Sequence, residues 1–357
     1  MGGSRGMKAA VFEGVGRLEV REVGTPEAGP GEVLVKVGAN TLCGTDLRIL
    51  RGEKTAGIKP PAIIGHEVAG HIVEVGDGVR GFEAGAQVTI TPMIPCGRCF
   101  YCRRDMENVC ENVRAVGYEI PGGLGEYMKV PAEAIEAGCL FVAEEELSPE
   151  RLALVEPLSC CVYGQVRSPV EAGDTVLVIG AGPIGLFHVQ LALLAGAETV
   201  IVSQRSEHRR RLASQFGAHV VVDPSGGELP EVVAEHTQGR GVDATFLCIG
   251  VPQLVNEALR LTRKGGRVNL FAGFAGAGLS EIEANLIHYN ELRVTGQTGA
   301  RREDFAAALD LVVSGRIETE RMITARFPLE EAPKAMEAAS GREGIKVAVI
   351  PGYRDKT

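Results

Sequence analysis

The stretch that decides the fold is "TVLVIGAGPIG", residues 175 to 185. Its first five residues are apolar or β-branched and predict a buried strand, and the segment "LFHVQLALLAG" that follows predicts a helix. Between them, three glycines have the GxGxxG spacing of a dinucleotide-binding turn. One glycine permits the tight turn, one lets a pyrophosphate approach the backbone, and one lets the helix pack on the strand. We therefore expect a dinucleotide site at Gly180, Gly182, Pro183, Ile184 and Gly185.

The sequence around this turn continues the same α/β pattern. From residue 168 to about residue 298, uniformly apolar strands alternate with helices; the strands are "TVLVIG", "TVIVS", "HVVVD", "DATFLCIG", "RVNLFAGF" and "LRVTGQ". This alternation predicts a doubly wound parallel sheet of about six strands with helices on both faces. The tail adds helices at "DFAAALDLVVSG" and "LEEAPKAMEAAS" and a closing strand, "KVAVIP".

The N-terminal part of the chain has a different rhythm. Up to about Val142, short β-rich pieces such as "KAAVFE", "GEVLVKVGAN" and "AGHIVEVG" are separated by Gly and Pro. This pattern predicts a small antiparallel barrel. Met1 to Gly6 are expected to form a short flexible leader.

The segment "VIVSQRSEHRRR", residues 200 to 211, ends the second strand of the α/β part and bears on the choice of cofactor. It lacks the acidic residue that would hold the ribose of NAD and repel a 2′-phosphate, and Gln204 stands there instead. Arg205 and Ser206 offer donors to phosphate oxygens, and we assign Arg210 to the same site. NADP is therefore expected in preference to NAD. The alternative for the run from Arg209 to Arg211 is a solvated helix face without a ligand.

Four of the nine cysteines lie close together in "CGRCFYCRRDMENVC", at Cys96, Cys99, Cys102 and Cys110. Four thiolates in one loop can complete a tetrahedral zinc shell with no position open for water or substrate, which is typical of structural zinc. Disulfides or buried free thiols are the alternative.

A second set of possible metal ligands is scattered along the chain. The segments are "TLCGTD" with Cys43, "IIGHEVAGH" with His66 and Glu67, and "VEPLSCC" with Glu156. A thiolate, an imidazole and a carboxylate form a three-ligand site with room for water or a substrate oxygen, as a catalytic zinc requires. Each segment alone is a weak indication, because a single Cys or His in an apolar stretch is more often a core residue.

The composition is that of an ordinary globular chain. Its 357 residues, of which 45% are hydrophobic and 23% charged, suffice for two domains. No run of about 18 apolar residues and no apolar signal segment occurs, so we expect a cytoplasmic protein that does not span a membrane. The net charge of −9 and the absence of a long basic stripe disfavour binding to nucleic acid or anionic membranes. Small molecules are the expected partners.

Together these motifs resemble the zinc-dependent medium-chain dehydrogenase/reductase (alcohol dehydrogenase) family, closest to its sorbitol, polyol and threonine dehydrogenase branch. The resemblance is carried, in order, by "CGTD", "GHE", the four-cysteine loop, "EPLSC" and "GAGPIG". It implies a Rossmann domain at residues 166–298, inserted into a GroES-like β-barrel catalytic domain formed by residues 1–165 and 299–357. It also implies an active site in the cleft between the domains and a homo-oligomer, either a homotetramer or a dimer.

The resemblance implies roles for individual residues. Cys43 and His66 would be ligands of the catalytic zinc, and Glu67 a ligand or a near neighbour. Glu156 stands where this branch has a carboxylate that binds zinc or its water, and which glutamate is the third ligand stays open. Thr45 would lie in the proton relay.

Further residues near these motifs have less specific interpretations. The resemblance implies that Asp46 orients His66 or its loop, although Thr45 and Asp46 could simply cap a turn. We interpret His71 as a core residue. Cys160 and Cys161 are expected to pack, and Tyr118 and Glu119 either contact substrate hydroxyls or belong to a solvent-facing loop.

The function that follows is a zinc-dependent oxidoreductase with two zinc ions per chain. It would transfer hydride between NADP(H) and a polyol, sugar or secondary alcohol or ketone. One alternative is a threonine or simple secondary-alcohol dehydrogenase that uses NAD or NADP. Another is a protein without catalytic activity that binds zinc and NADPH as a sensor.

Overall fold

The computed structural model of the chain describes residues 6–274, 278–341 and 344–354 and divides into two compact units. Unit 1 comprises the residues up to Ser159, Gly299–Gly315 and the residues from Thr319 onward, and unit 2 comprises Cys160–Thr298 and Arg316–Glu318. The expected leader lies outside the described residues except for Gly6, which is already part of a strand. Among the described residues, no helix is long and apolar enough to cross a membrane.

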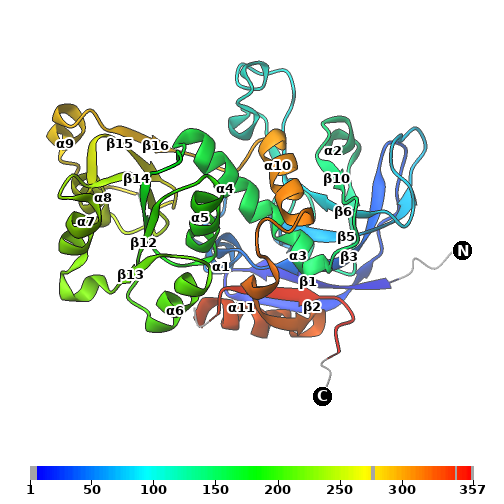
Figure 1. The fold of residues 1–357 in the computed structure, drawn as a ribbon. Coiled ribbons are helices and arrows are strands. Elements are labelled where there is room, and N and C mark those ends of the chain that lie inside the picture. Colours follow the sequence, from blue (N-terminus) through cyan, green and yellow to red (C-terminus); the bar gives the residue numbers. More distant parts are fainter. Residues whose placement is uncertain (1–5, 275–277, 342–343, 355–357) are drawn as a thin grey trace, which may run out of the picture. The chain divides into compact units, whose positions relative to one another are not determined.

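Unit 2 contains a six-stranded sheet in which every strand pair is parallel (Figure 1). Its strands are β11 (Thr175–Ile179), β12 (Thr199–Ser203), β13 (Val220–Val222), β14 (Val242–Leu247), β15 (Thr262–Leu270) and β16 (Arg293–Gly296). The spatial order is β13-β12-β11-β14-β15-β16, so the chain order reverses between β11 and β14. Sheets of this kind bind ligands at that reversal, beyond the carboxyl ends of the strands. The parallel sheet expected from the sequence is confirmed.

Helices lie on both faces of this sheet. They are α5 (Pro183–Leu194), α6 (Glu207–Gln215), α7 (Leu229–Thr237), α8 (Leu254–Leu261) and α9 (Ala284–Tyr289). Ile179 of β11 shares a core cluster with Val233 of α7 and Val255 of α8. Its neighbour Val178 lies beside Gly185 at the start of α5. Because successive strand residues point to opposite faces, α5 lies on one face and α7 and α8 lie on the other.

Unit 1 is built from three sheets, of seven, three and two strands. Its strands are β1 (Gly6–Gly14), β2 (Arg17–Gly24), β3 (Val33–Thr41), β4 (Ala62–Ile63), β5 (Glu67–Val75), β6 (Gln87–Ile90), β7 (Met93–Ile94), β8 (Arg114–Ala115), β9 (Tyr127–Val130), β10 (Leu140–Val142), β17 (Ile323–Pro328) and β18 (Lys346–Ile350). The largest sheet has the order β10-β6-β5-β3-β18-β17, with β9 also paired to β3. Its core includes Val35, Ile72, Val88 and Met128, one from each of four strands.

The pairing in unit 1 differs from the expected antiparallel barrel at one edge. Strands β17 and β18 pair in parallel, whereas the other strand pairs of unit 1 are antiparallel. The reason is that helix α11 (Ala332–Gly341) lies between them in the chain. Parallel neighbours need such a crossover, whereas a short turn joins antiparallel ones.

Of the remaining helices, the one at residues 302–313 matches a helix expected from the sequence, whereas the four between residues 44 and 167 were not expected. The helices are α1 (Gly44–Leu50), α2 (Ala132–Glu136), α3 (Pro149–Ala153), α4 (Val155–Arg167) and α10 (Arg302–Val313), and short 3₁₀ turns occur at η1 (Cys102–Arg104), η2 (Glu107–Val109), η3 (Pro224–Gly226), η4 (Glu320–Met322) and η5 (Leu329–Glu331). Helix α4 matters for the site because Glu156 lies in its first turn.

Candidate active site

Three possible metal ligands of unit 1 meet in space although they come from two separate segments. Cys43 is the N-cap of α1, His66 directly precedes β5, and Glu67 is the first residue of β5. One ligand atom from each lies within 4.8 Å of the others, and both His66 and Glu67 are buried. The structure therefore brings together a thiol, an imidazole and a carboxylate.

Asp46, in the first turn of α1, contacts two members of this cluster. The backbone N–H of Cys43 donates a hydrogen bond to Asp46 Oδ2 at 2.9 Å, and Asp46 Oδ1 lies 3.4 Å from His66 Nδ1. Because Nδ1 faces the buried carboxylate, Nε2 is the ring nitrogen left for a metal. Thr45 lies between Cys43 and Asp46 in the first turn of α1 and is half-buried. Its part in a proton relay stays a prediction.

Glu67 is held by a buried lysine that the sequence analysis did not find. Lys346 Nζ of β18 donates to both carboxylate oxygens of Glu67 and, at 3.1 Å, to the carbonyl oxygen of Leu42. The Thr41 hydroxyl donates to Glu67 Oε2. Burial alone would lower the pKa of Lys346, but the negative charge of Glu67 outweighs burial and raises it. The pair spans 279 positions of the chain, and no local pattern signals it.

Glu156 is the fourth candidate ligand and lies outside the group of three ligand atoms within 4.8 Å. Burial raises the pKa of its carboxyl to about 7; the positive charges of His66 and Lys346 act against this shift, and the negative charge of Glu67 acts with it. Glu156 therefore feels the charges of the cluster. A carboxyl with a pKa near neutrality can hold or release a proton under physiological conditions.

The residues of this cluster fit a zinc ion. A thiolate, an imidazole and a carboxylate are ligands that zinc prefers, and a three-ligand set leaves a position for water or substrate. Burial alone would lower the pKa of His66, yet the negative charges of Asp46 and Cys43 raise it well above its usual value. The surroundings that stabilise a proton on His66 would equally stabilise a metal cation beside it.

Three further residues with open interpretations are Tyr118 and Glu119, in the loop at residues 115–120, and His71 of β5. The Tyr118 ring lies 5.8 Å from the His66 ring, centroid to centroid, and burial raises the pKa of Tyr118 to about 12. Glu119 is exposed and accepts a hydrogen bond from the Ala115 N–H at 3.0 Å. The interpretation of His71 as a core residue is wrong: its side chain is 36% exposed and lies 3.0 Å from Glu146, because it points to the solvated face of β5.

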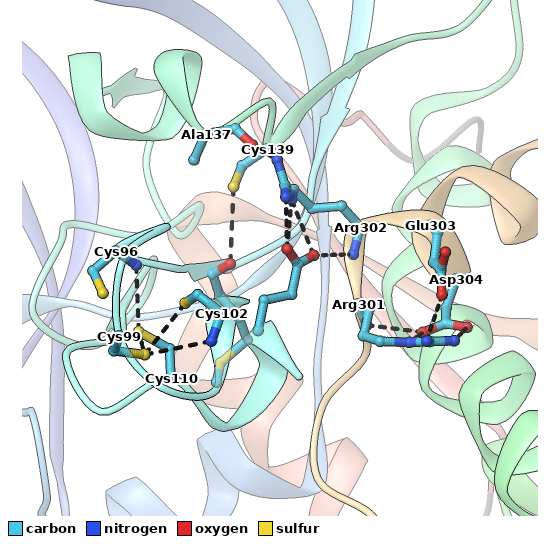
Figure 2. A network of polar contacts seen from close by, with 12 residues as sticks. Cys96, Cys99, Cys102, Cys110, Ala137, Cys139, Arg301, Arg302, Glu303 and Asp304 are labelled. Atoms are coloured by element: carbon cyan, nitrogen blue, oxygen red, sulfur yellow. Dashed lines mark hydrogen bonds and ion pairs between the residues drawn. The ribbon is translucent and has the colours of Figure 1, made fainter. Parts of the chain in front are cut away.

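The four-cysteine loop brings its sulfur atoms together in the way a tetrahedral zinc site requires (Figure 2). The Sγ atom of Cys99 lies 3.5 Å from that of Cys102 and 3.8 Å from that of Cys110. Zinc–sulfur bonds of about 2.3 Å give a tetrahedron with edges of about 3.8 Å. The disulfide alternative does not hold, because all four thiols are free. A backbone N–H of Arg98 lowers the pKa of Cys96 to about 6, which favours the thiolate.

An ion pair joins this loop to α10. Glu107 of η2 accepts hydrogen bonds from the backbone N–H of Arg302 at 2.6 Å and from its Nε and Nη2 at 2.9 Å and 2.6 Å. Arg302 also donates to the carbonyl oxygen of Ala137 (Figure 2). The loop is thus tied to the start of α10 as well as to its own strands β7 and β8.

The glycine turn of unit 2 has the shape of a phosphate-binding turn. Gly180 has a φ of +101°, which favours glycine, and a Cβ at Gly185 would lie 1.9 Å from the Gly180 carbonyl oxygen. At Gly182, the N-cap of α5, a Cβ would meet only Arg209 Nη1, at 3.8 Å. Gly180 is therefore required by the turn and Gly185 by the packing of the helix. Gly182 leaves open space before the helix N-terminus, where pyrophosphate binds in such turns.

Among the predicted cofactor residues in and after the loop that follows β12, some bind the loop or helix itself and others are exposed or uncharged. Arg210 Nη1 donates to the carbonyl oxygens of Gln204 and Arg205 and to Asp223 Oδ2, at 2.6 to 2.8 Å, so Arg210 holds the loop itself. Ser206 is the N-cap of α6, and its hydroxyl accepts from the Arg209 N–H. Arg205 is exposed, and Gln204 has no charge.

Arg209 belongs to the run from Arg209 to Arg211, for which a solvated helix face was the alternative, and it lies in the first turn of α6. Its guanidinium lies against the glycine turn at Gly182. Its position in the sequence could have indicated a place near the cofactor, because the first turn of α6 starts just beyond the strand that carries the cofactor loop.

Comparisons with known proteins agree with this geometry. Residues 29–137 match the family described as alcohol dehydrogenase GroES-like domain, and residues 183–314 match zinc-binding dehydrogenase. The chain is 38% identical to L-threonine 3-dehydrogenase of Pyrococcus furiosus (93% of this chain, 95% of the relative) and 32% identical to D-arabitol-phosphate dehydrogenase of Enterococcus avium (94% of each). A solved structure described as a zinc-binding dehydrogenase of Sinorhizobium meliloti 1021 bound to NADP is 42% identical, with a TM-score of 0.91 over 97% of this chain and all of that one.

Proposed function

The chain belongs to the zinc-dependent medium-chain alcohol dehydrogenase family, and we propose that it transfers hydride between NADP(H) and a polyol, a sugar or a secondary alcohol or its ketone. The observation that carries this proposal is the meeting of Cys43, His66 and Glu67 in one buried cluster, with ligand atoms within 4.8 Å of one another. A homo-oligomer and a cytoplasmic location stay predictions.

Residues in and beside the cluster have two different roles in the proposed reaction, metal binding and orientation of the ligands. Zinc held by Cys43, His66 and either Glu67 or Glu156 would supply a Lewis acid for the substrate oxygen, and NADP(H) would supply the hydride chemistry. Asp46 holds the Cys43 amide and faces His66 Nδ1, which keeps the imidazole in one orientation.

Proton movement is assigned to residues of the chain. We propose that Thr45 Oγ1 accepts the proton of a substrate hydroxyl and passes it toward solvent. Glu156, with a pKa of about 7, can take up a proton close to the cluster. Lys346 holds Glu67 in place, because it donates to both of its carboxylate oxygens.

The preference for NADP is supported by the loop after β12. Gln204 brings no charge that would repel a 2′-phosphate, and the exposed Arg205 can reach a bound phosphate. Arg209 lies beside Gly182 and adds a second positive charge near the turn. The NADP-bound relative supports the same preference. Arg210 takes part indirectly, since its guanidinium shapes the loop.

A second candidate is a threonine or simple secondary-alcohol dehydrogenase. The 38% identity to L-threonine 3-dehydrogenase favours it. It would use the same cluster with a different substrate, and either NAD or NADP.

The test is the variant Cys43→Ala, analysed for zinc content and for turnover. We expect two zinc ions per chain in the wild type and one in the variant. Turnover should fall about a thousandfold or more, because a bound metal supplies several kcal/mol of transition-state stabilisation. Full turnover in the variant would show that this cluster is not the reaction centre, and a single zinc ion in the wild type would remove one of the two metal sites.

The matched control is Cys139→Ala. Cys139 is also a buried thiol of unit 1, but it belongs to neither metal cluster. This variant should keep both zinc ions and wild-type turnover.

A further inference from the structure

A lysine lies next to the candidate active site and forms no ion pair with the residues that the structure describes. Lys54 Nζ stands over the ring of Tyr118, 5.5 Å from its centroid, and Tyr118 in turn faces His66 at 5.8 Å. The ammonium group is therefore at most about 11 Å from the His66 ring, since the two separations cannot add to more. All three residues belong to unit 1.

The position of Lys54 is fixed by the element that also carries the cluster. Its backbone N–H donates to the carbonyl oxygen of Arg48 in α1, at 3.3 Å. Helix α1 begins at the cap formed by Cys43 and contains Thr45 and Asp46. The lysine is thus anchored to the same short helix as the predicted zinc ligand and the predicted proton relay.

The charge of Lys54 is available to a ligand. The neighbouring Glu53 lies 3.9 Å from Arg48 and 3.6 Å from Arg51, so two arginines already share its charge. No ion pair of Lys54 occurs within the part of the chain that the structure describes. The side chain is half-buried, and packing over an aromatic ring keeps its ammonium group near the ring face.

The acidic groups nearby are engaged elsewhere. Glu67 is neutralised by Lys346, and Asp46 faces His66 and the Cys43 amide. Glu119, whose carboxylate packs at Gly57, accepts a hydrogen bond from the Ala115 N–H. Lys54 is therefore a positive group beside Tyr118, outside the Cys43–His66–Glu67 cluster, that can attract a negative charge on a ligand.

We propose that Lys54 binds an anionic group of the substrate, so that the preferred substrate is a short-chain alcohol carrying a carboxylate or a phosphate monoester. This inference rests on the proposed function and names the substrate class of the same site. The reacting hydroxyl lies at the Cys43–His66–Glu67 cluster, and the anionic end reaches Lys54 along the Tyr118 ring. A neutral polyol would leave the ammonium group without a counter-charge.

The test compares two matched pairs of substrates in the holoenzyme with NADP. One pair is L-threonine and L-threonine amide, and the other is a pentitol phosphate and the same pentitol. The measured quantity is the ratio of kcat/KM for the anionic member to that for the neutral member. The first pair reports on a carboxylate and the second on a phosphate, so the two arms distinguish the sources of the negative charge.

The variants are Lys54→Met, which keeps the length of the side chain, and Lys54→Arg, which keeps the charge. In at least one pair the wild type should prefer the anionic member, and Lys54→Met should reduce the ratio about ten- to a hundredfold, mainly through KM, as expected for a lost charge-assisted bond. Lys54→Arg should keep most of the preference. The control Lys59→Met removes an exposed lysine of the same segment and should leave the ratio as in the wild type.

A ratio that Lys54→Met leaves unchanged in both pairs would overturn the proposal. Calorimetric titration of the same four compounds into the NADPH complex of each variant separates this result from a failure of the proposed function. If no alcohol is oxidised, the proposed function fails. Binding of an anionic compound that is weakened in Lys54→Met but not in Lys59→Met would still support the anion site, and equal binding would refute it.

Discussion

Gln204 and Arg205 are neighbours with different tasks in the cofactor loop. Gln204 stands where a carboxylate would select NAD, and its backbone is bound into the loop by Arg210 and by the Val222 carbonyl oxygen. Arg205 contributes its carbonyl oxygen to the same loop and leaves its guanidinium exposed. The backbone of the loop is thus fixed by residues other than those proposed to contact the phosphate.

We predict that Gln204→Asp combined with Arg205→Ala moves the cofactor preference toward NAD. The new carboxylate would repel the 2′-phosphate and accept hydrogen bonds from the ribose hydroxyls, and the loss of Arg205 would remove a charge-assisted donor. The ratio of kcat/KM for NADP to that for NAD should fall about a hundredfold. The control is Arg211→Ala. Arg211 is an exposed residue of α6, the helix after this loop, and pairs with Glu207, so its replacement should leave the ratio unchanged. An unchanged ratio in the double variant would mean that the loop does not select the cofactor.

The residues that sequence motifs identify and those they miss differ in a physical way. Cys43, His66 and the cysteines of the loop are recognisable because ligand chemistry restricts each position to a few residue types. Lys346 and Lys54 are not, because a lysine is common at surfaces and acquires its role only from a partner distant in the chain. Lys346 meets Glu67 across 279 positions, and Lys54 meets Tyr118 through the fold.

At the scale of elements, the ion pair between η2 and α10 supports the four-cysteine loop. Burial alone would raise the pKa of Glu107, but the hydrogen bonds and the charge of Arg302 outweigh it and lower the pKa below its ordinary value of 4.5. The Glu107 side chain is 13% exposed and the Arg302 side chain 42% exposed. Screening by solvent therefore weakens the pair without removing it.

We predict that Glu107→Gln lowers the free energy of unfolding by about 1–2 kcal/mol near neutral pH. The contribution of Glu107 is present above the pKa of the unfolded chain, because its folded pKa is the lower of the two, and it disappears as the pH falls through the folded value. The difference between wild type and variant, measured by denaturant unfolding at several pH values, should therefore shrink below about pH 4.5.

The control for this experiment is Glu111→Gln in the same loop. Glu111 is exposed, so its replacement should change the stability by less than about 0.5 kcal/mol. A variant Glu107→Gln as stable as this control at neutral pH would show that the ion pair does not support the loop.

Elements were predictable where their patterns are local. The strand and helix around the glycine turn follow from periodicity and from the demands of the turn itself, as Gly180 and Gly185 show. Helix α4 was not predicted, because its thirteen residues include a Pro, a Gly and three valines, all of which are unfavourable in a helix. The parallel pair of β17 and β18 could not be read from strand patterns, since pairing direction depends on the crossover through α11.

At the scale of the whole molecule, the cluster in unit 1 is assembled from distant parts of the chain. Cys43, His66 and Glu67 come from the N-terminal region, and Lys346, which holds Glu67, comes from the C-terminal strand β18. Glu156, whose pKa responds to the charges of the cluster, comes from α4. The return of the chain to unit 1 thus supplies a residue that the cluster needs, in addition to completing a sheet. The family resemblance predicted this return, and the α/β and GroES-like architecture is confirmed by the strand order and the family matches.

The most direct test of the central claim is the rate at which the holoenzyme reduces NADP and NAD in parallel, followed by the absorbance of the reduced nicotinamide. The substrates would be a panel of polyols, sugars, amino alcohols and their anionic derivatives. We expect at least one of them to reduce NADP with a kcat/KM about tenfold or more above that with NAD. Reduction of neither nucleotide by any compound, or a clear preference for NAD, would contradict the account.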